Sequence, residues 1–282
     1  AMEHPPRTWN PSEASDESLL TLINRQPPKA GPGPSGLRAE HLQAVTPSNR
    51  PLLVRFLRCL VKNPAIFPRM LQQALSSSRL LPFIKPDKGE GSVAEIPRRV
   101  RVRPIAVPEV LRKLAAQWVL GGVSSRLRAL LAPEQLGISV RSGCEQALHA
   151  VVAHLYYEPQ HALLQLDLEN SFNRIDRRVA AKVAETCFPE LMPILALAYA
   201  ESEESAPMQF AWASCNEAEH HIADRLFLEA KTGVQQGDPL GPVLHALALA
   251  PFLRALRRKF PELTLVAVHD DISLVGDLQG LK

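Results

Sequence analysis

The chain has 282 residues, 46% of them hydrophobic and 22% charged, which is enough apolar content to bury a sizeable core and excludes a chain disordered throughout. A net charge of +3 does not by itself identify a partner, and four cysteines without Cys-x-x-Cys spacing favour a reduced, intracellular protein over a zinc or disulfide scaffold. The longest apolar run, residues 239–253, is too short and too interrupted by proline to span a bilayer, so no membrane association is expected.

The N-terminal part of the chain predicts a tail followed by a small helical layer. Residues 1–30 are rich in Pro, Ser and charge and are expected to form a tether, with one short capped helical pattern at residues 15–23. A Gly-Pro-Ser-Gly turn at residues 33–36 leads into the next helix. Helical periodicity over residues 52–60 and 70–75 completes this layer.

Two predicted strands then flank a basic loop. Residues 80–84 and 100–107 have the composition and alternation of strands, and basic residues outnumber acidic ones between residues 85 and 113. Such local positive charge is expected where a surface meets phosphate. An ordinary solvated loop would have the same composition, so the charge alone does not decide between the two.

Two helices are expected next. The apolar spacing from residue 110 to 131 predicts one long amphipathic helix, and a loop at residues 135–138 separates it from a second helix over residues 146–156. The histidines of the second helix, His149 and His154, are expected to be surface residues rather than metal ligands. The reason is that no full set of three or four ligands accompanies them.

An acidic residue stands at the end of a strongly apolar strand. Residues 163–168 have the pattern of this strand, and Asp167 lies near its end. The apolar positions that follow, from Phe172 to Val183, recur with helical spacing and predict one helix. An acid is favourable at a helix N-terminus because of the helix dipole, so Asp167 has a purely structural explanation as well.

Two further acids lie near the C-terminus. Residues 266–275 have the pattern of two short strands with Asp270-Asp271 at the hairpin tip, where Asn-Gly or Asp-Gly is usual. A solvated surface turn is the simpler explanation for such a pair taken alone. Carboxylates from two strands of one sheet can, however, hold divalent cations about 3.5 to 4 Å apart, which is the geometry of two-metal phosphoryl transfer.

The segment between these acids is the most specific part of the sequence. Residues 233–242 read Gly-Val-Gln-Gln-Gly-Asp-Pro-Leu-Gly-Pro, and an apolar helix is predicted over residues 243–253. Asp-x-x-x-Ser-Phe starting at Asp167, then this segment, then Asp270-Asp271 resemble motifs A, B and C of reverse transcriptases. The resemblance is greatest to those of non-LTR retrotransposons.

This resemblance implies an α+β fold, a reverse-transcriptase-like right hand with an antiparallel palm sheet packed by helices and with helical and hairpin fingers. Residues 1–30 would be the tail, residues 31–159 the fingers and first palm helices, and residues 160–282 the palm with the three motifs. The chain stops at Lys282, soon after motif C. The thumb is therefore expected to be absent, the domain being truncated before it.

The activity implied is that of an RNA-directed DNA polymerase, a two-metal transfer of dNTPs onto a primer 3′-hydroxyl with Mg²⁺, or with Mn²⁺ as a substitute. The catalytic residues and metal ligands implied by the motifs are Asp167, Asp270 and Asp271, with the backbone carbonyl of Leu168 as a further ligand. The dNTP contacts implied are Lys85, Arg103, Phe172 and Gln236, with Lys88 as second choice for the lysine. An RNA template and a nucleic-acid primer are the partners implied, in the nucleus or cytoplasm.

Three details bear on substrate and template. Phe172 stands where reverse transcriptases place an aromatic ring under the ribose, which would exclude a 2′-hydroxyl sterically and favour deoxynucleotides. The alternative is that Phe172 is only the first core residue of its helix. The Gln-x-Gly loop at residues 135–138 resembles one that touches the template, and Asp238 is expected to cap a helix rather than bind metal.

The sequence also departs from the family pattern. Motif C normally carries an aromatic residue and an alanine before its two acids, where this chain has Val268 and His269, so weakened activity is expected. The alternative function is a non-catalytic or decayed reverse-transcriptase-like module that binds RNA or a protein partner. An RNA-directed RNA polymerase is a third possibility, against which Phe172 argues. The sequence does not indicate an oligomeric state.

Overall fold

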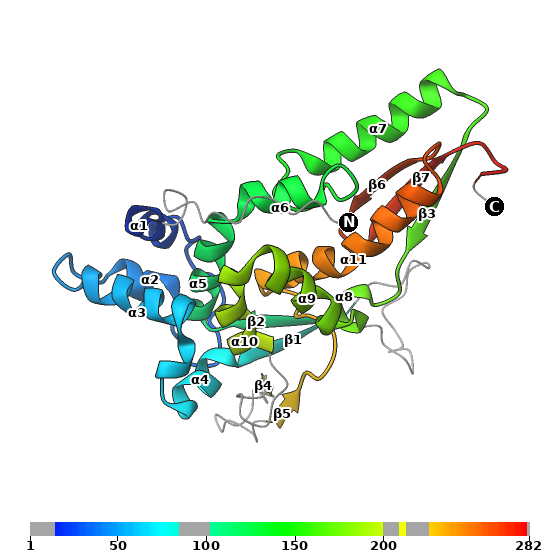
Figure 1. Ribbon diagram of the computed structural model, residues 1–282. Helices are drawn as coiled ribbons and strands as arrows, with labels where there is room; N and C mark the ends of the chain where they lie inside the picture. The colour runs from blue at the N-terminus through cyan, green and yellow to red at the C-terminus, as the bar shows by residue number, and fades with distance from the viewer. Residues whose placement is uncertain (1–14, 85–101, 200–208, 213–225, 281–282) are drawn as a thin grey trace.

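The computed structural model describes residues 15–84, 102–199, 209–212 and 226–280 (Figure 1). Its helices are α1 (Asp16–Asn24), α2 (Ala39–Gln43), α3 (Arg50–Lys62), α4 (Arg69–Ser76), α5 (Val110–Gly121), α6 (Ser124–Leu131), α7 (Gly143–Tyr157), α8 (Ser171–Arg174), α9 (Arg177–Cys187), α10 (Met192–Tyr199) and α11 (Leu240–Lys259), with 3₁₀ turns η1 (Pro64–Ile66) and η2 (Pro189–Leu191). Helices and small antiparallel sheets alternate along the chain, so the expected mixture of the two is confirmed.

The strands of the described ranges form two sheets. One has the order β2-β1-β4-β5, and the other has the order β3-β7-β6. The strands are β1 (Ser78–Ile84), β2 (Val102–Pro108), β3 (Ala162–Asp167), β4 (Gln209–Trp212), β5 (Leu226–Glu229), β6 (Thr264–Val268) and β7 (Asp271–Gly276). Every pair is antiparallel except β1 with β4. The two strands predicted on either side of the basic loop therefore pair, with Ser78 opposite Pro108.

The three-stranded sheet is covered by a helix on each face. Side chains alternate between the two faces along each strand, so both faces carry apolar residues that pack on a helix. Ile272 and Leu274 belong to a buried cluster with Leu253 of α11. Val275 points the other way and belongs to a cluster with Val151 of α7. Figure 1 shows α7 lying along this sheet at one end of the molecule, whereas α2, α3 and α4 lie at the opposite end. The sheet is thus fixed between two long helices, and the orientation of each strand residue follows from its position in the alternation.

A larger apolar core lies among the helices. Leu57 of α3, Leu114 of α5 and Leu247 of α11 are all fully buried within it. Helix α1 joins the same core through Leu19 and Ile23, and the Ser15 side chain caps it by accepting a hydrogen bond from the Ser18 N–H. Part of the stretch expected to be a tail is therefore a packed helix, because its apolar residues recur on one helical face.

The single long helix predicted over residues 110–131 is wrong. The chain forms α5 and α6 instead, separated by Gly122 and Val123. Two consecutive glycines, Gly121 and Gly122, weaken the helix at this point because glycine loses the most backbone entropy on ordering. The apolar spacing continued across the break, which is why periodicity alone did not reveal it.

The single helix predicted after Asp167 is also wrong. Helix α8 ends at Arg174, Ile175 is extended with φ −61° and ψ 146°, and α9 starts after Asp176. The Asp176 carboxylate accepts a hydrogen bond from the Arg178 N–H, so it caps a new helix. The break frees α8 to form a separate short turn directly beside the end of β3.

None of the helices in the described ranges is both long and apolar enough to cross a lipid bilayer.

Candidate functional site

The C-terminal acids lie on a tight hairpin between β6 and β7. Val268 pairs with Asp271, so the two residues of the turn are His269 and Asp270. The prediction of an Asp-Asp tip is therefore wrong by one residue. His269 takes the positive φ that such a turn needs, at 57°, and histidine tolerates this region better than most side chains. Asp271 is consequently a strand residue whose direction is set by the sheet.

The acid at the end of β3 lies directly opposite this strand residue. The antiparallel register pairs Asp167 with Asp271. Cα atoms of opposed residues are roughly 4.5 to 5.5 Å apart. Asp270 is one residue away from Asp271, about 3.8 Å between Cα atoms, which places Asp167 and Asp270 within roughly 9 Å of each other. Three acids from two distant parts of the sequence are therefore brought together at one end of the sheet.

These three carboxylates are oxygen ligands of the kind that Mg²⁺ takes, but their side chains do not form a ready metal site. The side chains of Asp167 and Asp271 are exposed. They lie on the face of the sheet opposite Ile272 and Leu274, the two residues that pack against α11. Like charges directly opposite each other in a ladder destabilise it, and a bound cation would relieve this repulsion. Mg²⁺ prefers carboxylate oxygens and retains waters or phosphates in its other positions. Across the described part of the chain, no three His, Cys, Asp or Glu side chains are placed so that they could hold a metal ion, so a metal site at these acids stays a prediction.

The backbone carbonyl of Leu168 remains a predicted ligand. It accepts a hydrogen bond from the Ser171 N–H at 3.2 Å, which closes the turn between β3 and α8. A carbonyl oxygen has two lone pairs, so this bond leaves one for a cation. Asn170, in the same turn, takes a positive φ of 50°. The turn therefore fixes the carbonyl of Leu168 next to Asp167.

The Phe172 ring is held by a buried histidine. It stacks on His245 of α11 with ring centroids 4.4 Å apart and an interplanar angle of 5°, and His245 is fully buried. The Ser171 hydroxyl and His245 Nε2 share a hydrogen bond. Burial lowers the pKa of His245 to about 4, against an opposing effect of Asp270, so the ring is neutral at pH 7. His269 of the hairpin lies 6.4 Å from the Phe172 ring, so Phe172 reaches toward the acids.

The loop that contains Gln236 is fixed between β2 and the motif A turn. The carbonyl of Gln236 accepts a hydrogen bond from the Ala106 N–H at 2.7 Å, and the Val234 N–H donates to the carbonyl of Phe172 at 2.6 Å. Gly237 has φ 108°, and a Cβ there would lie 2.4 Å from the Ala106 carbonyl oxygen. Only glycine fits this approach. The Gln236 side chain is left half-buried beside Phe172's segment.

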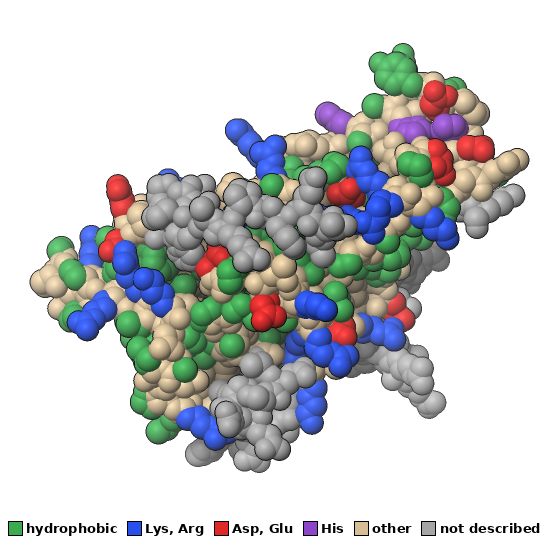
Figure 2. Space-filling model, in the orientation of Figure 1, with side chains coloured by type: hydrophobic (Ala, Val, Ile, Leu, Met, Phe, Trp, Pro, Cys, Tyr) green, Lys and Arg blue, Asp and Glu red, His purple; other side chains and the backbone are tan. Residues whose placement is uncertain are grey.

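The two predicted triphosphate contacts are not equally placed by the structure. Arg103 is exposed on β2, opposite Phe83, and lies on the strand that holds the Gln236 loop. Lys85 and Lys88 lie outside the described residues, as does most of the basic segment. Figure 2 shows basic and acidic side chains interspersed on one face of the molecule. The prediction of a phosphate-binding fingertip therefore stays a prediction.

The loop that resembles a template-contacting one carries a glutamine that holds the acidic hairpin. Gln135 is fully buried, its Nε2 donates to the carbonyl of His269 at 3.0 Å, and its Oε1 accepts from the His269 N–H at 2.8 Å. The Gly137 N–H also donates to Oε1. Adjacent backbone bonds join residue 136 to Ala267. The side chain of Gln135 thus fixes both polar groups of the residue before Asp270.

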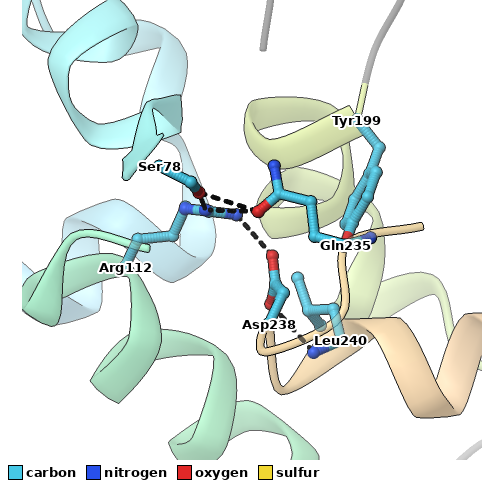
Figure 3. A network of polar contacts seen from close by, with 6 residues as sticks. All are labelled: Ser78, Arg112, Tyr199, Gln235, Asp238 and Leu240. Atoms are coloured by element: carbon cyan, nitrogen blue, oxygen red, sulfur yellow. Dashed lines mark hydrogen bonds and ion pairs between the residues drawn. The ribbon is translucent and has the colours of Figure 1, made fainter. Parts of the chain in front are cut away.

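Sequence reasoning also missed a buried ion pair behind the Gln236 loop. Arg112 of α5 and Asp238 form a 2.5 Å contact between Nη1 and Oδ2 (Figure 3). The other oxygen of Asp238 accepts a hydrogen bond from the N–H of Leu240, the first residue of α11, at 3.0 Å, although Pro239 is the N-cap residue of that helix. The prediction that Asp238 is itself the N-cap is therefore wrong by one residue. The only indication of this ion pair in the sequence is that Arg112 lies on the apolar face of its helix, where a charged residue is unusual.

Comparison with known proteins gives one curated relative and one set of structural similarities. No protein-family model matches the chain. The chain is 23% identical over 277 residues to the retrotransposable element SLACS 132 kDa protein of Trypanosoma brucei gambiense. This match includes 95% of the chain and 21% of that protein, so the chain spans about a fifth of its relative's length.

The chain is thus similar to a retrotransposon protein. Among solved structures it is similar to apo telomerase of Candida tropicalis truncated from the C-terminal domain, with a TM-score of 0.46 and 13% identity. That superposition covers 73% of this chain and 45% of the telomerase chain.

Proposed function

We propose that the chain contains the fingers and palm of a retroelement's RNA-directed DNA polymerase. The observation that carries this proposal is the register that puts Asp167 opposite Asp271, with Asp270 in the adjoining turn. The similarity to a retrotransposon protein over 95% of the chain supports it independently. An acidic pair across a ladder and a Gln-Gly-Asp-Pro loop between the two acids in the sequence are not expected to occur together in this order by chance.

The proposed reaction is attack of a primer 3′-hydroxyl on the α-phosphorus of a dNTP. A new phosphodiester bond forms, the bond to the β-phosphate oxygen breaks, and pyrophosphate leaves with the electron pair. Asp167, Asp270 and Asp271 would hold Mg²⁺, with the Leu168 carbonyl as a further ligand. When bound, Mg²⁺ lowers the pKa of the attacking hydroxyl and neutralises charge on the leaving pyrophosphate. Asp167 and Asp271 are exposed and Asp270 is half-buried, so the carboxylates remain accessible to a substrate that brings its own phosphate ligands.

The remaining residues would position the nucleotide. Phe172, stacked on His245, would present a fixed ring to the sugar and exclude a 2′-hydroxyl by contact. Gln236 would contact the incoming nucleotide from the loop that β2 holds, and Arg103 and Lys85 would contact its phosphates. Replacement of Phe172 by alanine should therefore increase the use of ribonucleotides relative to deoxynucleotides. If the folded variant uses ribonucleotides and deoxynucleotides in the same ratio as the wild type, Phe172 has only a packing role.

Primer extension on an RNA template tests the activity. The assay would compare dNTPs with NTPs, and Mg²⁺ with Mn²⁺, for the wild type and Asp270→Asn. Asp277→Asn is a matched control because Asp277 is exposed just after β7. We expect extension with dNTPs that is lost in Asp270→Asn and kept in Asp277→Asn. Equal extension by the wild type and Asp270→Asn would refute the assignment.

A non-catalytic module that binds RNA or a protein partner is the second candidate. Val268 favours it, since the ring that the family places at this position is replaced by a short aliphatic side chain. Tight RNA binding by the wild type, without extension under any metal or nucleotide, would support this second function. Either function would operate inside the cell, in the nucleus or the cytoplasm.

A further inference from the structure

One buried arginine, Arg112, contacts the loop that carries Gln236 at two of its side chains, in addition to the backbone hydrogen bonds that hold the loop. Arg112 is fully buried, and Asp238 is 2% exposed. Besides the ion pair with Asp238, Nη2 of Arg112 donates to the Ser78 hydroxyl at 2.8 Å and to Gln235 Oε1 at 3.3 Å. Figure 3 shows these side chains converging from separate elements. One planar guanidinium therefore contacts β1 and both ends of a short loop segment.

The network continues to a third element. The Ser78 hydroxyl also lies 2.7 Å from Gln235 Oε1, and the Gln235 N–H donates to the Tyr199 hydroxyl of α10 at 3.3 Å. Burial and the nearby Asp238 carboxylate raise the pKa of Tyr199, so its hydroxyl stays protonated. Strand β1 and helices α5 and α10 are therefore all connected to the loop through Gln235 and Asp238.

Such a network contributes geometry more than stability. Removing two charges from water opposes the gain from pairing them, so well-packed apolar residues often stabilise a core equally well. The fork of arginine fixes the direction of several acceptors at once, which a flexible side chain does not. A buried pair at this position is therefore best explained by what it holds in place.

Gln236 is the residue that this network holds. It stands between Gln235 and Asp238, whose side chains Arg112 fixes, while its own carbonyl is fixed by the Ala106 N–H. The loop is thus tied on two sides, and the Gln236 side chain remains half-buried. We propose that Arg112 and Asp238 are positioning residues that set the nucleotide-binding conformation of the Gln236 loop. This inference rests on the proposed polymerase function and deepens it.

The main test removes both charges together. Arg112→Met and Asp238→Asn each leave one buried charge unpaired, and each single variant should melt roughly 10 °C below the wild type. The double variant has no unpaired charge and keeps an oxygen that can accept the Leu240 N–H. We expect it to fold, with its melting temperature close to that of the wild type. Its KM for dNTP should rise about tenfold with a smaller change in kcat, because one positioning contact network is lost.

A second buried ion pair provides the matched control. Arg126 and Glu190 pair between α6 and η2, with side chains 9% and 12% exposed, in a part of the fold separate from the Gln236 loop. Arg126→Met with Glu190→Gln removes the same chemistry and should leave the KM for dNTP unchanged. Arg112→Lys keeps the charge but loses the fork, so it should give an intermediate rise in KM. A folded Arg112→Met, Asp238→Asn variant with a wild-type KM would overturn the inference.

Hydrogen exchange separates failure of this inference from failure of the proposed function. In the double variant, amides of residues 233–241 should exchange faster, whereas those of β6 and β7 should not change. If the wild type extends no primer and Asp270→Asn binds Mn²⁺ as the wild type does, the polymerase function fails. Unchanged exchange of residues 233–241 in the folded double variant overturns the positioning role, whatever the outcome of the extension assay.

Discussion

The acidic hairpin and the Gln236 loop hold functional residues in opposite ways. At the hairpin and the neighbouring strand β3, backbone ladders set the positions of Asp271 and Asp167, and both carboxylates are exposed. In the loop, buried side chains set the geometry, and Asp238 is almost fully buried. A ladder survives replacement of a side chain, whereas a buried charge network does not. Substitutions in the hairpin should therefore affect the reaction, and substitutions in the loop should affect the fold as well.

The largest expected effect is on activity alone. Asp167→Asn should lower primer extension by roughly 100- to 1,000-fold, since one electrostatic contact to the reacting centre is lost. The melting temperature should stay the same or rise, because a like-charge pair across the ladder is removed. Extension and thermal unfolding are measured on the same preparation. Glu169→Gln, an exposed acid in the same turn, is the control, and a comparable loss of activity there would contradict the site.

The next largest effect is expected on the free energy of unfolding, from a substitution in the Gln236 loop. Gly237→Ala combines a positive φ with a clash against the Ala106 carbonyl, so we expect a loss of roughly 2 to 3 kcal/mol in unfolding free energy. Urea denaturation measures it. Gly121→Ala is the matched control because a Cβ there meets nothing within 4 Å. An equal effect of the two substitutions would show that the loop is not closely packed.

A smaller effect is expected where a side chain supports the hairpin. Gln135→Leu leaves both the His269 N–H and its carbonyl without a partner, which should cost about 2 kcal/mol. Gln135→Glu can still accept from the N–H and should be intermediate. Gln160→Leu, at an exposed glutamine, should be neutral. The measurement is urea denaturation, with exchange of the His269 amide as a local probe. A protected amide in Gln135→Leu would show that the ladder alone holds the turn.

The last effect, similar in size to that of Gln135→Leu and present only at acidic pH, is a pH dependence from His245. The pKa of His245 is about 4 in the folded protein, below the ordinary value of 6.5. As the pH falls, His245 therefore binds a proton in the unfolded state before it does so in the folded state. The stabilisation is present above pH 6.5 and is lost as pH falls toward 4. Between pH 7 and pH 5 the loss should be roughly 2 kcal/mol in metal-free buffer. His245→Phe should remove this component from unfolding curves, and His149→Phe, at an exposed histidine, should retain it.

The site was partly predictable because its signals are local. Asp167 and Asp271 each adjoin a segment whose alternating apolar residues predict a strand and the face that each side chain occupies. Pairing of the two strands then places the two acids opposite each other. Gln135 and Arg112 gave no such signal. Their partners lie 134 and 126 residues away, and only packing brings them within hydrogen-bond distance. The resemblance of residues 135–138 to a template-contacting loop did not indicate that the Gln135 side chain binds His269.

The sequence by itself determined most of the helices and strands and placed Asp167 and Asp271 at strand ends, because these follow from periodicity over a few residues, but it did not predict α10, β4 or β5. It did not determine the helix breaks at Gly122 and Ile175, or the hairpin tip at His269-Asp270, since these depend on backbone angles. The tertiary structure alone decided which buried polar groups meet. Their free energy depends on partners that the chain supplies only after the core has formed.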